Sequence, residues 1–301
     1  MKKKGKICIS GSQGFIGSYV TKCLLNAGYQ VVGFDNYSKY GVVVRAHDNH
    51  PNFKLYVMDV LSDDFKETFY HEKCEYFLQL ACMVGGIEYF HKYQYTLLAE
   101  NEKLNAQSFE VSIKGHQEGW LKRVIVFSSS MVYENILQYP TPEDVTIIAP
   151  ASSYGFSKLA SEYFCKAAFD QFGLKYTIVR PFNAVGIGED SALSENEITD
   201  GNKEMMLSHV IPDQITKILK CGGNEPVEIL GSGNQIRCFT AGDDIGRAIK
   251  LIIENEKEAI NNEFNISTPM ATNILELSEM IWKEIYPNKP FKYISKTPFK
   301  Y

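Results

Sequence analysis

Paired cysteines, long apolar runs and an excess of basic charge are all missing from this sequence. Its seven cysteines are odd in number and never form a CxxC pair, so neither a disulfide framework nor a cysteine zinc site is expected. No apolar run approaches the roughly 18 residues that a membrane-spanning helix needs. The basic start MKKKGK is too short for a signal peptide and predicts a solvated end ahead of a strand. These absences favour a cytoplasmic protein with no membrane partner.

The charge balance and the histidines narrow the function classes further. A net charge of −5 argues against a nucleic-acid partner, which would normally meet a basic face. HDNH at 47–50 places two histidines three positions apart, but no third ligand is evident nearby, so no metal is expected. An apolar content of 45% with 22% charged residues is ordinary for a globular protein. At 301 residues the chain suits one large domain, or a large domain with an added smaller lobe.

Short β-rich apolar runs recur along the first part of the chain and alternate with helical patterns. Helical spacing of apolar residues is clear at 15–28, 97–113 and 155–173. Strands that alternate with helices require a parallel sheet with right-handed crossovers, covered by helices on both faces. The expected fold class is therefore α/β, with a Rossmann-type doubly wound parallel sheet. Its six expected strands lie at 6–11, 30–35, 53–60, 74–81, 124–130 and 175–181.

The regular alternation of strand and helix patterns ends after Pro181. A polar stretch at 186–204 is long enough to be a functional loop. Helical patterns and one strand-like run then follow, at 207–222, 227–230, 243–255 and 274–286. We expect residues 1–180 to form a dinucleotide-binding Rossmann domain. Residues 181–301 are expected to form a smaller, mixed substrate-binding lobe that is interleaved with the first domain.

The segment SGSQGFIGS lies between the first expected strand and the first expected helix. Gly11 can supply the tight turn, Gly14 lets the backbone approach a pyrophosphate, and Gly17 allows the helix to pack closely on the strand. Asp35 ends the next strand, where a carboxylate accepts hydrogen bonds from an adenosine ribose and repels a 2′-phosphate. Because FDN at 34–36 has no nearby arginine for that phosphate, the pattern favours NAD over NADP.

Further cofactor contacts are expected along the same edge of the sheet. Asp59 follows the third strand, where it either meets the adenine or is a solvated strand end. The small residues after the fourth strand can approach the cofactor. The expected cofactor contacts are Gly11, Gln13, Gly14, Phe15, Ile16, Gly17, Asp35, Asn36, Asp59, Val60, Leu80, Ala81 and Lys158.

A serine run and a tyrosine–lysine pair fall at one edge of the expected sheet. FSSSMVYE ends the fifth strand at its carboxyl edge, where open α/β sheets bind ligands, and Tyr154 and Lys158 open the next helix on one face. A tyrosine pKa is ordinarily about 10, but an ammonium group and a positive nicotinamide ring nearby favour its phenolate. A serine there can hydrogen-bond the same substrate oxygen. Each feature alone suits an ordinary surface residue; in this order they predict a site for proton and hydride transfer.

Seven segments in order carry a resemblance to a known family: GSQGFIG, FDN, MDV, VIVFSSSMVY, SSYGFSKLASE, VRPFNAVGIGE and GSGNQIRCFTAGDDIGRAI. They resemble the extended short-chain dehydrogenase/reductases, specifically the nucleotide-sugar epimerase/dehydratase family. The resemblance implies a Rossmann domain that holds NAD and a C-terminal lobe that grips a nucleoside-diphosphate sugar, linked to UDP, GDP or dTDP. It also implies a homodimer.

The resemblance implies a role for several side chains. Tyr154 is the implied base and Lys158 its helper, with Ser129 in the Ser/Thr position and Ser130 as the alternative. The implied substrate contacts are Asn101, Asn183 and Arg237. A guanidinium is well matched to diphosphate oxygens, although Arg237 is also compatible with an ordinary surface arginine.

The sequence departs from the family's pattern in two places. Dehydratases acting at sugar positions 4 and 6 usually carry an Asp-Glu pair after the catalytic Ser/Thr, where this chain has Ser130 and Met131. Glu134 stands where a glycine often follows VY. It is interpreted either as a substituted catalytic acid/base near the sugar or as a solvated loop residue, the second being favoured.

The leading hypothesis is an NAD-dependent epimerase of a nucleotide sugar, most simply at C4 through a 4-keto intermediate. Tyr154 removes the hydroxyl proton while NAD takes the hydride, and the ketosugar turns over before the hydride returns to its other face. The alternative is a nucleotide-sugar dehydratase that begins with the same oxidation and uses Glu134 as an unusual acid. A non-enzyme interpretation, an NAD-binding sensor or scaffold, is less favoured because the Tyr-x-x-x-Lys pair is intact.

Overall fold

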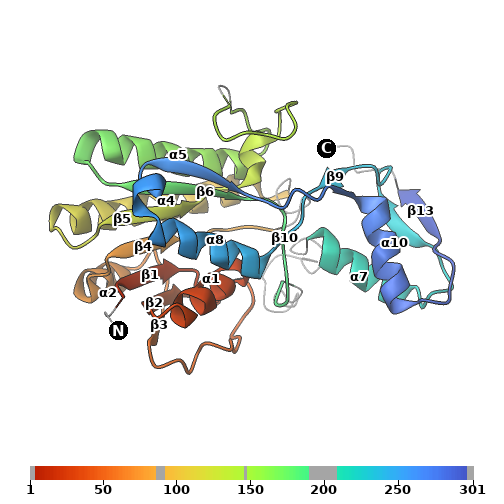
Figure 1. Ribbon diagram of the computed structural model, residues 1–301, viewed down its shortest axis with the longest axis horizontal. Coiled ribbons are helices and arrows are strands. Elements are labelled where there is room, and N and C mark those ends of the chain that lie inside the picture. Colours follow the sequence, from red (N-terminus) through yellow and green to blue (C-terminus); the bar gives the residue numbers. More distant parts are fainter. Residues whose placement is uncertain (1–3, 86–91, 146–147, 190–208, 297–301) are drawn as a thin grey trace.

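Seven parallel strands form the centre of the protein, in the order β11-β6-β5-β4-β1-β2-β3 (Figure 1). The computed structural model describes residues 4–85, 92–145, 148–189 and 209–296, so most of the expected loop at 186–204 lies outside the described residues. The parallel sheet confirms the expected α/β class. Its strands are β1 (Lys6–Ser10), β2 (Gln30–Asp35), β3 (Phe53–Val57), β4 (Tyr76–Gln79), β5 (Arg123–Phe127), β6 (Tyr176–Pro181) and β11 (Asn262–Ile266).

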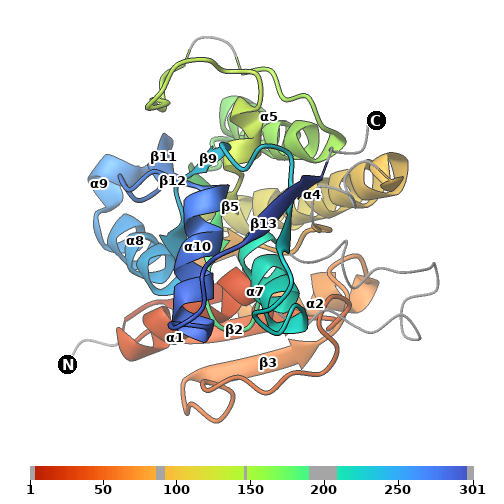
Figure 2. The same cartoon turned by 90° about the vertical axis from the view of Figure 1, so that its right-hand side faces the viewer.

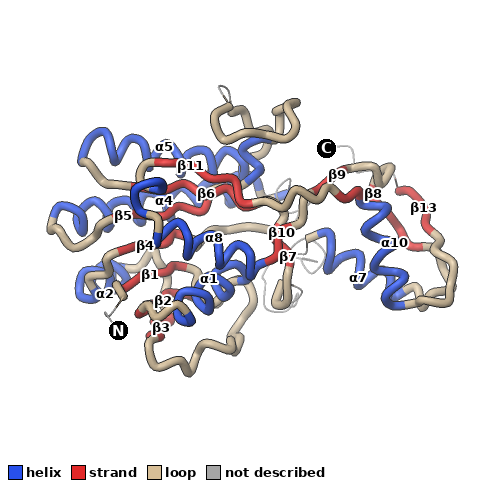
Figure 3. The backbone as a smooth tube through the Cα atoms, viewed as in Figure 1, coloured by secondary structure: helices blue, strands red, loops and turns tan. Residues whose placement is uncertain are grey.

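Helices cover both faces of this sheet (Figure 3). The helices are α1 (Phe15–Asn26) and α8 (Gly242–Glu254) on one face, and α2 (Asp63–Glu72), α4 (Gln94–Gln117) and α5 (Ser153–Phe172) on the other. Successive side chains of a strand point to opposite faces, and β1 follows this rule. Ile7 and Ile9 are buried in the core beneath α1 and α8, whereas Cys8 is buried in the core on the other face.

The strand at one edge of the sheet comes from late in the chain. β11 pairs in parallel with β6, and α8 packs against α1. The chain therefore leaves the sheet after β6 and returns to it with residues 242–266. The sequence analysis did not predict β11, because NEFNI has too few apolar residues to mark a strand. Its polar side chains are used inside the protein: Glu263 forms ion pairs with Arg180 and Lys166.

A smaller lobe lies to one side of the sheet and faces the viewer in Figure 2. Trp282 is buried at its centre, together with Ile218 and Val227. The helices expected at 207–222 and 274–286 and the strand expected at 227–230 are present there. The elements of this lobe are α7 (Val210–Lys220), β8 (Val227–Leu230), β9 (Ile236–Arg237), β12 (Thr272–Asn273), α10 (Ile274–Ile285) and β13 (Tyr293–Lys296). The described residues also include the short elements η1 (Ser130–Tyr133), β7 (Ala184–Val185), β10 (Thr240–Ala241) and α9 (Glu256–Ala259).

The described part of the chain holds no helix long and apolar enough to cross a membrane. Within those same residues, no three His, Cys, Asp or Glu side chains gather as a metal site would require. The HDNH segment has a different use, since His47 is buried edge-on against the ring of Phe53, with 4.9 Å between ring centroids.

Burial of His47 predicts a specific loss of stability in acid. The pKa of His47 is lowered to about 4, mainly by desolvation; Asp48 opposes this shift, and Arg45 and His50 add to it. The unfolded chain takes up this proton near pH 6.5, and the folded protein only near pH 4, so the free energy of unfolding should fall as the pH drops through that window. Urea titrations of the wild type and His47→Phe should show a shallower fall in the variant. Equal slopes for the two proteins would contradict the assignment.

Candidate active site

The glycine-rich turn after β1 is shaped to leave the start of α1 open. Gly11 has a φ of +75°, which favours glycine, and its N–H donates to the carbonyl of Phe34 at 2.7 Å. A Cβ on Gly17 would lie only 1.9 Å from the Gly11 oxygen, so α1 can approach the turn only with glycine there. α1 begins at Phe15 with no acidic residue in its first turn and no side-chain cap. Its first N–H groups are therefore available to an anion such as a pyrophosphate, with Gly14, Phe15, Ile16 and Gly17 around it.

Asp35 ends β2 beside this turn. One of its carboxylate oxygens accepts the N–H of Gln13 at 2.9 Å, and the other accepts the N–H of Tyr37 at 2.8 Å. A carboxylate oxygen accepts more than one hydrogen bond, so both can still receive ribose hydroxyls. Asn36 donates from Nδ2 to Asp59 at 2.9 Å, which ties the ends of β2 and β3 together. An open helix start for phosphates and a carboxylate for a ribose together fit a dinucleotide.

The end of β4 forms the neighbouring wall. The N–H of Leu80 donates to the Ser10 carbonyl at 3.2 Å, and the N–H of Ala81 donates to the Ser10 hydroxyl at 3.3 Å. A Cβ on Gly11 would lie 3.0 Å from the Ala81 nitrogen, so the two turns are in close contact. Val60 is buried in the core beneath β3 and β2. Apart from Lys158 on α5, the cofactor residues expected from the sequence thus lie at the ends of four neighbouring strands, β1 to β4.

Asn101, on α4, fixes the loop that follows β4. Its Oδ1 accepts the N–H of Met83 at 2.7 Å, and its Nδ2 donates to the Met83 carbonyl at 3.0 Å and to the Ser157 hydroxyl at 3.3 Å. The amide therefore joins this loop to α5 and is occupied by protein groups. The expected substrate contact is placed near the site, and its bonds suit a residue that positions the loop.

Ser129, Tyr154 and Lys158 come together at the carboxyl end of β5. Ser129 caps the short 3-10 helix η1 (Ser130–Tyr133), and its hydroxyl lies in hydrogen-bond contact with Tyr154. Lys158 donates from Nζ to the Phe127 carbonyl at 2.8 Å and lies 5.7 Å from the centroid of the Tyr154 ring. Tyr154 and Lys158 are each only 8% exposed. Ser130, the alternative serine, begins η1 and is half-buried.

The surroundings of Tyr154 control its proton. Burial raises the pKa of Tyr154 well above its ordinary value, the nearby Cys82 thiol raises it further, and the hydrogen bond from Ser129 lowers it. The protein alone therefore keeps the phenol neutral. Additional positive charge beside the ring, such as an oxidised nicotinamide, would favour the phenolate.

The structure places Glu134 at the start of α5. Its Oε2 accepts hydrogen bonds from the N–H of Ala151 at 2.7 Å and from the N–H and hydroxyl of Ser152 at 2.7 and 2.9 Å. Ser152 is in turn the N-cap of α5, through a 3.0 Å bond from the N–H of Gly155. These contacts show a half-buried carboxylate, one oxygen of which is tied to the protein backbone. It holds the helix start that carries Tyr154.

The contacts of Glu134 predict different outcomes for two substitutions. In Glu134→Gln one amide oxygen can still accept all three hydrogen bonds, so turnover should stay within about threefold of the wild type. Glu134→Ala leaves two backbone N–H groups without this acceptor and should lower turnover by roughly tenfold or more through a misplaced Tyr154. Steady-state kinetics on both variants would separate this anchor from an acid/base role, in which Glu134→Gln is the more damaging change.

A buried ionic network ties down the serine segment that follows β5. Arg180, which is fully buried, donates from Nε and Nη2 to Glu162 at 2.8 and 2.6 Å and also pairs with Glu263. Ser128 donates to Glu162 at 2.5 Å, and Arg180 donates to the Tyr133 hydroxyl at 2.5 Å. Both ends of the segment 128–133 are thus tied to one guanidinium–carboxylate pair. The sequence analysis missed this network, although an arginine inside the apolar run KYTIVRP was an available signal.

Asn183 and Arg237, the other expected substrate contacts, lie close together in the chain's second part. Asn183 has a φ of +34° and donates from Nδ2 to the Cys238 carbonyl at 3.2 Å. Its own carbonyl accepts the N–H of Thr240 at 3.1 Å. The guanidinium of Arg237, on β9, is exposed and bonds to the Ile236 carbonyl at 2.8 Å. Its remaining donors are available to an anion.

An arginine that the FDN segment does not reveal lies near the glycine-rich turn. Arg45 follows Asp35 by ten positions, yet its Nε and Nη2 donate to the Gln13 carbonyl at 3.1 and 2.8 Å. A loop between β2 and β3 brings it back, which the spacing of FDN does not reveal. The preference for NAD therefore rests on Asp35 alone, whose carboxylate repels a 2′-phosphate.

Comparisons with known proteins agree on one family. Residues 7–267 match the model of the "NAD dependent epimerase/dehydratase family". The structure is similar to UDP-glucose 4-epimerase from Thermotoga maritima, with a TM-score of 0.78 and 28% identity over 98% of this chain and 86% of that one. It is similar in fold to UDP-glucuronic acid 4-epimerase from Bacillus cereus, solved with UDP-glucuronic acid and NAD, with a TM-score of 0.78 and 23% identity over 97% and 86% of the two chains. UDP-N-acetylglucosamine 4-epimerase from Methanobrevibacter ruminantium has a TM-score of 0.77 and 23% identity over 99% and 87%.

Proposed function

Because the chain belongs to the NAD-dependent epimerase/dehydratase family, we propose that it is a 4-epimerase of a nucleoside-diphosphate sugar, with UDP-sugars as the first candidates. One observation carries the choice of reaction. Ser129, Tyr154 and Lys158 meet at the end of β5, while the positions of a dehydratase acid pair hold Ser130 and Met131. Neither of these two side chains can donate a proton for the loss of water at neutral pH.

The proposed mechanism assigns one task to each side chain. Tyr154 takes the proton of the sugar C4 hydroxyl, and Ser129 hydrogen-bonds the same oxygen. Lys158, held by the Phe127 carbonyl, places its ammonium beside the Tyr154 ring and favours the phenolate. NAD, when bound, would supply the hydride acceptor and donor for C4. If the hydride returned to the other face of a 4-keto sugar while Tyr154 gave back the proton, C4 would be inverted without net oxidation.

The experiment that tests this function offers several nucleotide sugars to the purified protein. Each nucleotide sugar is incubated with the protein, and the products are separated by liquid chromatography with mass detection. The set contains UDP-glucose, UDP-galactose, UDP-glucuronic acid, UDP-N-acetylglucosamine and several GDP- and dTDP-sugars. A new peak of unchanged mass supports an epimerase. Products lighter by one water would show a dehydratase, and bound NAD with no turnover of any sugar would show a sensor or scaffold.

We further propose that residues 1–180 hold the cofactor and residues 181–301 supply the substrate lobe, apart from the return of residues 242–266 to the sheet. In this arrangement Asn183 and Arg237 bind the substrate diphosphate. The exposed guanidinium of Arg237 supports its part, since guanidinium donors match phosphate oxygens in pairs. Asn101 then acts on the substrate through the loop at Met83.

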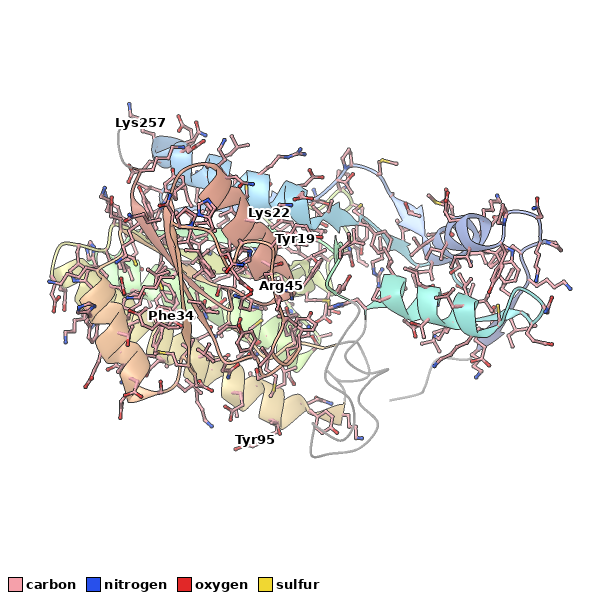
Figure 4. The ribbon with its side chains drawn as sticks, turned by 90° about the horizontal axis from the view of Figure 1, so that it is seen from below. Tyr19, Lys22, Phe34, Arg45, Tyr95 and Lys257 are labelled. Carbon is pink, nitrogen blue, oxygen red and sulfur yellow. The ribbon has the colours of Figure 1, made fainter. Side chains whose placement is uncertain are left out.

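A homodimer through α4 and α5 is part of the same proposal. The two helices pack side by side, and their outer surfaces carry exposed aromatic rings, of which Tyr95 extends outward in Figure 4. These rings are Tyr95 of α4 and, seven positions apart on one face of α5, Phe156 and Tyr163. Such a cluster is typical of an interface. All seven cysteines are free thiols, which supports the cytoplasm as the compartment.

A further inference from the structure

The segment between β2 and β3, residues 36–52, is tied onto the glycine-rich turn; we call it strap 36–52. The N–H of Arg45 donates to one carboxylate oxygen of Asp48 at 2.7 Å, and Gln13 donates from Nε2 to the other at 2.8 Å. The buried ring of His47 holds the strap from beneath. The backbone of the strap at Arg45 is therefore fixed relative to the turn that would receive a pyrophosphate.

The Arg45 guanidinium uses only part of its hydrogen-bonding capacity. Two of its five N–H groups point to the Gln13 carbonyl, at 3.1 and 2.8 Å. Among the described residues no other acceptor takes a hydrogen bond from this guanidinium, and the Tyr40 ring lies 6.0 Å from its central carbon. A half-buried guanidinium with unused donors, beside an open helix start, is suited to an anion.

A second loop meets Arg45 from across the α1 N-terminus. Nη1 of Arg45 lies 2.5 Å from the position that a Cβ on Gly188 would occupy, so guanidinium and loop are in contact. Tyr19 of α1 fixes this loop: its hydroxyl donates to the Ile187 carbonyl at 3.2 Å and its ring packs against Gly186. Figure 4 shows Tyr19 and Arg45 close to each other at this end of the sheet.

Three segments therefore converge at the start of α1: the glycine-rich turn, strap 36–52 and the loop 184–188. The other charged side chains named at this point, Asp35 and Asp48, are both acidic and repel phosphates. We propose that Arg45 binds the pyrophosphate of NAD together with the α1 N-terminus and so retains the cofactor between turnovers. The inference rests on the proposed function for its purpose: an epimerase returns each hydride to the same sugar, so its NAD never needs to leave.

The test measures exchange of bound NAD, with no sugar present. The holoenzyme is mixed with excess deuterated NAD, and native mass spectrometry follows replacement of the bound cofactor. Loss of a charge-assisted contact should make exchange in Arg45→Met roughly 10- to 100-fold faster than in the wild type. Arg45→Lys keeps the charge without the paired donors and should be intermediate. Arg247→Met is the matched control, since Arg247 is an exposed arginine of α8 paired with Asp244.

A purely structural role for Arg45 gives a different pattern. In that case Arg45→Met and Arg45→Lys would lower the melting temperature equally with and without NAD, and exchange would follow the loss of fold. That pattern overturns the inference, as does wild-type exchange in Arg45→Met or equal acceleration in Arg247→Met. Because no sugar is present, rapid exchange in Arg45→Met supports the inference even if no nucleotide sugar is epimerised.

Discussion

Replacing Tyr154 by phenylalanine is expected to lower kcat for the proposed epimerisation by roughly 10²–10⁴-fold, the usual contribution of a positioned acid/base. The ring keeps its shape and only the hydroxyl is lost, so the packing around Leu97 and Met83 should be retained. NAD should still co-purify, because none of the contacts at the glycine-rich turn involves Tyr154. The measurement is steady-state turnover of whichever UDP-sugar pair the wild type interconverts, alongside the NAD content of each protein.

Tyr163→Phe on the same helix is the matched control for this substitution. Tyr163 is 67% exposed, so loss of its hydroxyl should leave kcat within about twofold. If the Tyr154→Phe enzyme kept more than a tenth of the wild-type kcat, Tyr154 would not be the catalytic base. The pH profile gives a second check. Since burial raises the pKa of Tyr154 and the phenolate is the active form, kcat/KM should keep rising above neutral pH in the wild type.

Replacing Arg180 by methionine is expected to cost about 3–5 kcal/mol of unfolding free energy, the usual result of removing one partner from a buried ion pair. The change leaves Glu162, which is 1% exposed, beside Glu263 with only Lys166 to balance the two charges. It also removes the donor to Tyr133, so the segment 128–133 loses one of its ties. Urea denaturation at pH 7 measures the loss directly.

Arg247→Met again serves as the control, because an exposed ion pair contributes about 1 kcal/mol or less. A cost below 1 kcal/mol for Arg180→Met would show that the network is energetically neutral. The network also has a pH signature. Burial alone would raise the pKa of Glu263, but hydrogen bonding to Lys166 and the charge of Arg180 lower it overall. The stability that this carboxylate contributes is therefore present above its ordinary pKa and is lost as the pH falls below it.

The sheet and the main site could be predicted because their signals are local. Each strand from β1 to β6 is a short apolar run between turns, and side chains that face a core on both sides of a parallel sheet must be apolar. Tyr154 and Lys158 share one helix face by spacing alone. The glycine-rich turn carries its own signature, since Gly17 tolerates no Cβ beside the Gly11 carbonyl. Such features require no knowledge of distant parts of the chain.

The contacts that sequence could not supply all join residues that are far apart. Arg45 reaches Gln13 across 32 positions, Glu134 reaches Ala151 across 17, and Arg180 reaches Glu263 across 83. In each case the sequence around the charged side chain suggests a solvent-exposed residue. Only the folded structure brings its partner into contact with it. β11 was missed for the same reason, because its polar residues acquire partners only when it pairs with β6.

The late arrival of β11 also bears on how the chain can fold as it is made. Tyr176 of β6 hydrogen-bonds Asn261 across 85 positions, so the cofactor body cannot be completed until the residues up to 266 have left the ribosome. Until then β6 is an unpaired edge strand, and Arg180, which is buried in the folded protein, is exposed to solvent. Unpaired edge strands can pair with the wrong strand or with another chain. The nascent chain must hold a nearly finished sheet while α7, β8 and β9 of the small lobe are synthesised. Contacts of such long separation slow folding, so late steps at this edge are expected to limit the rate.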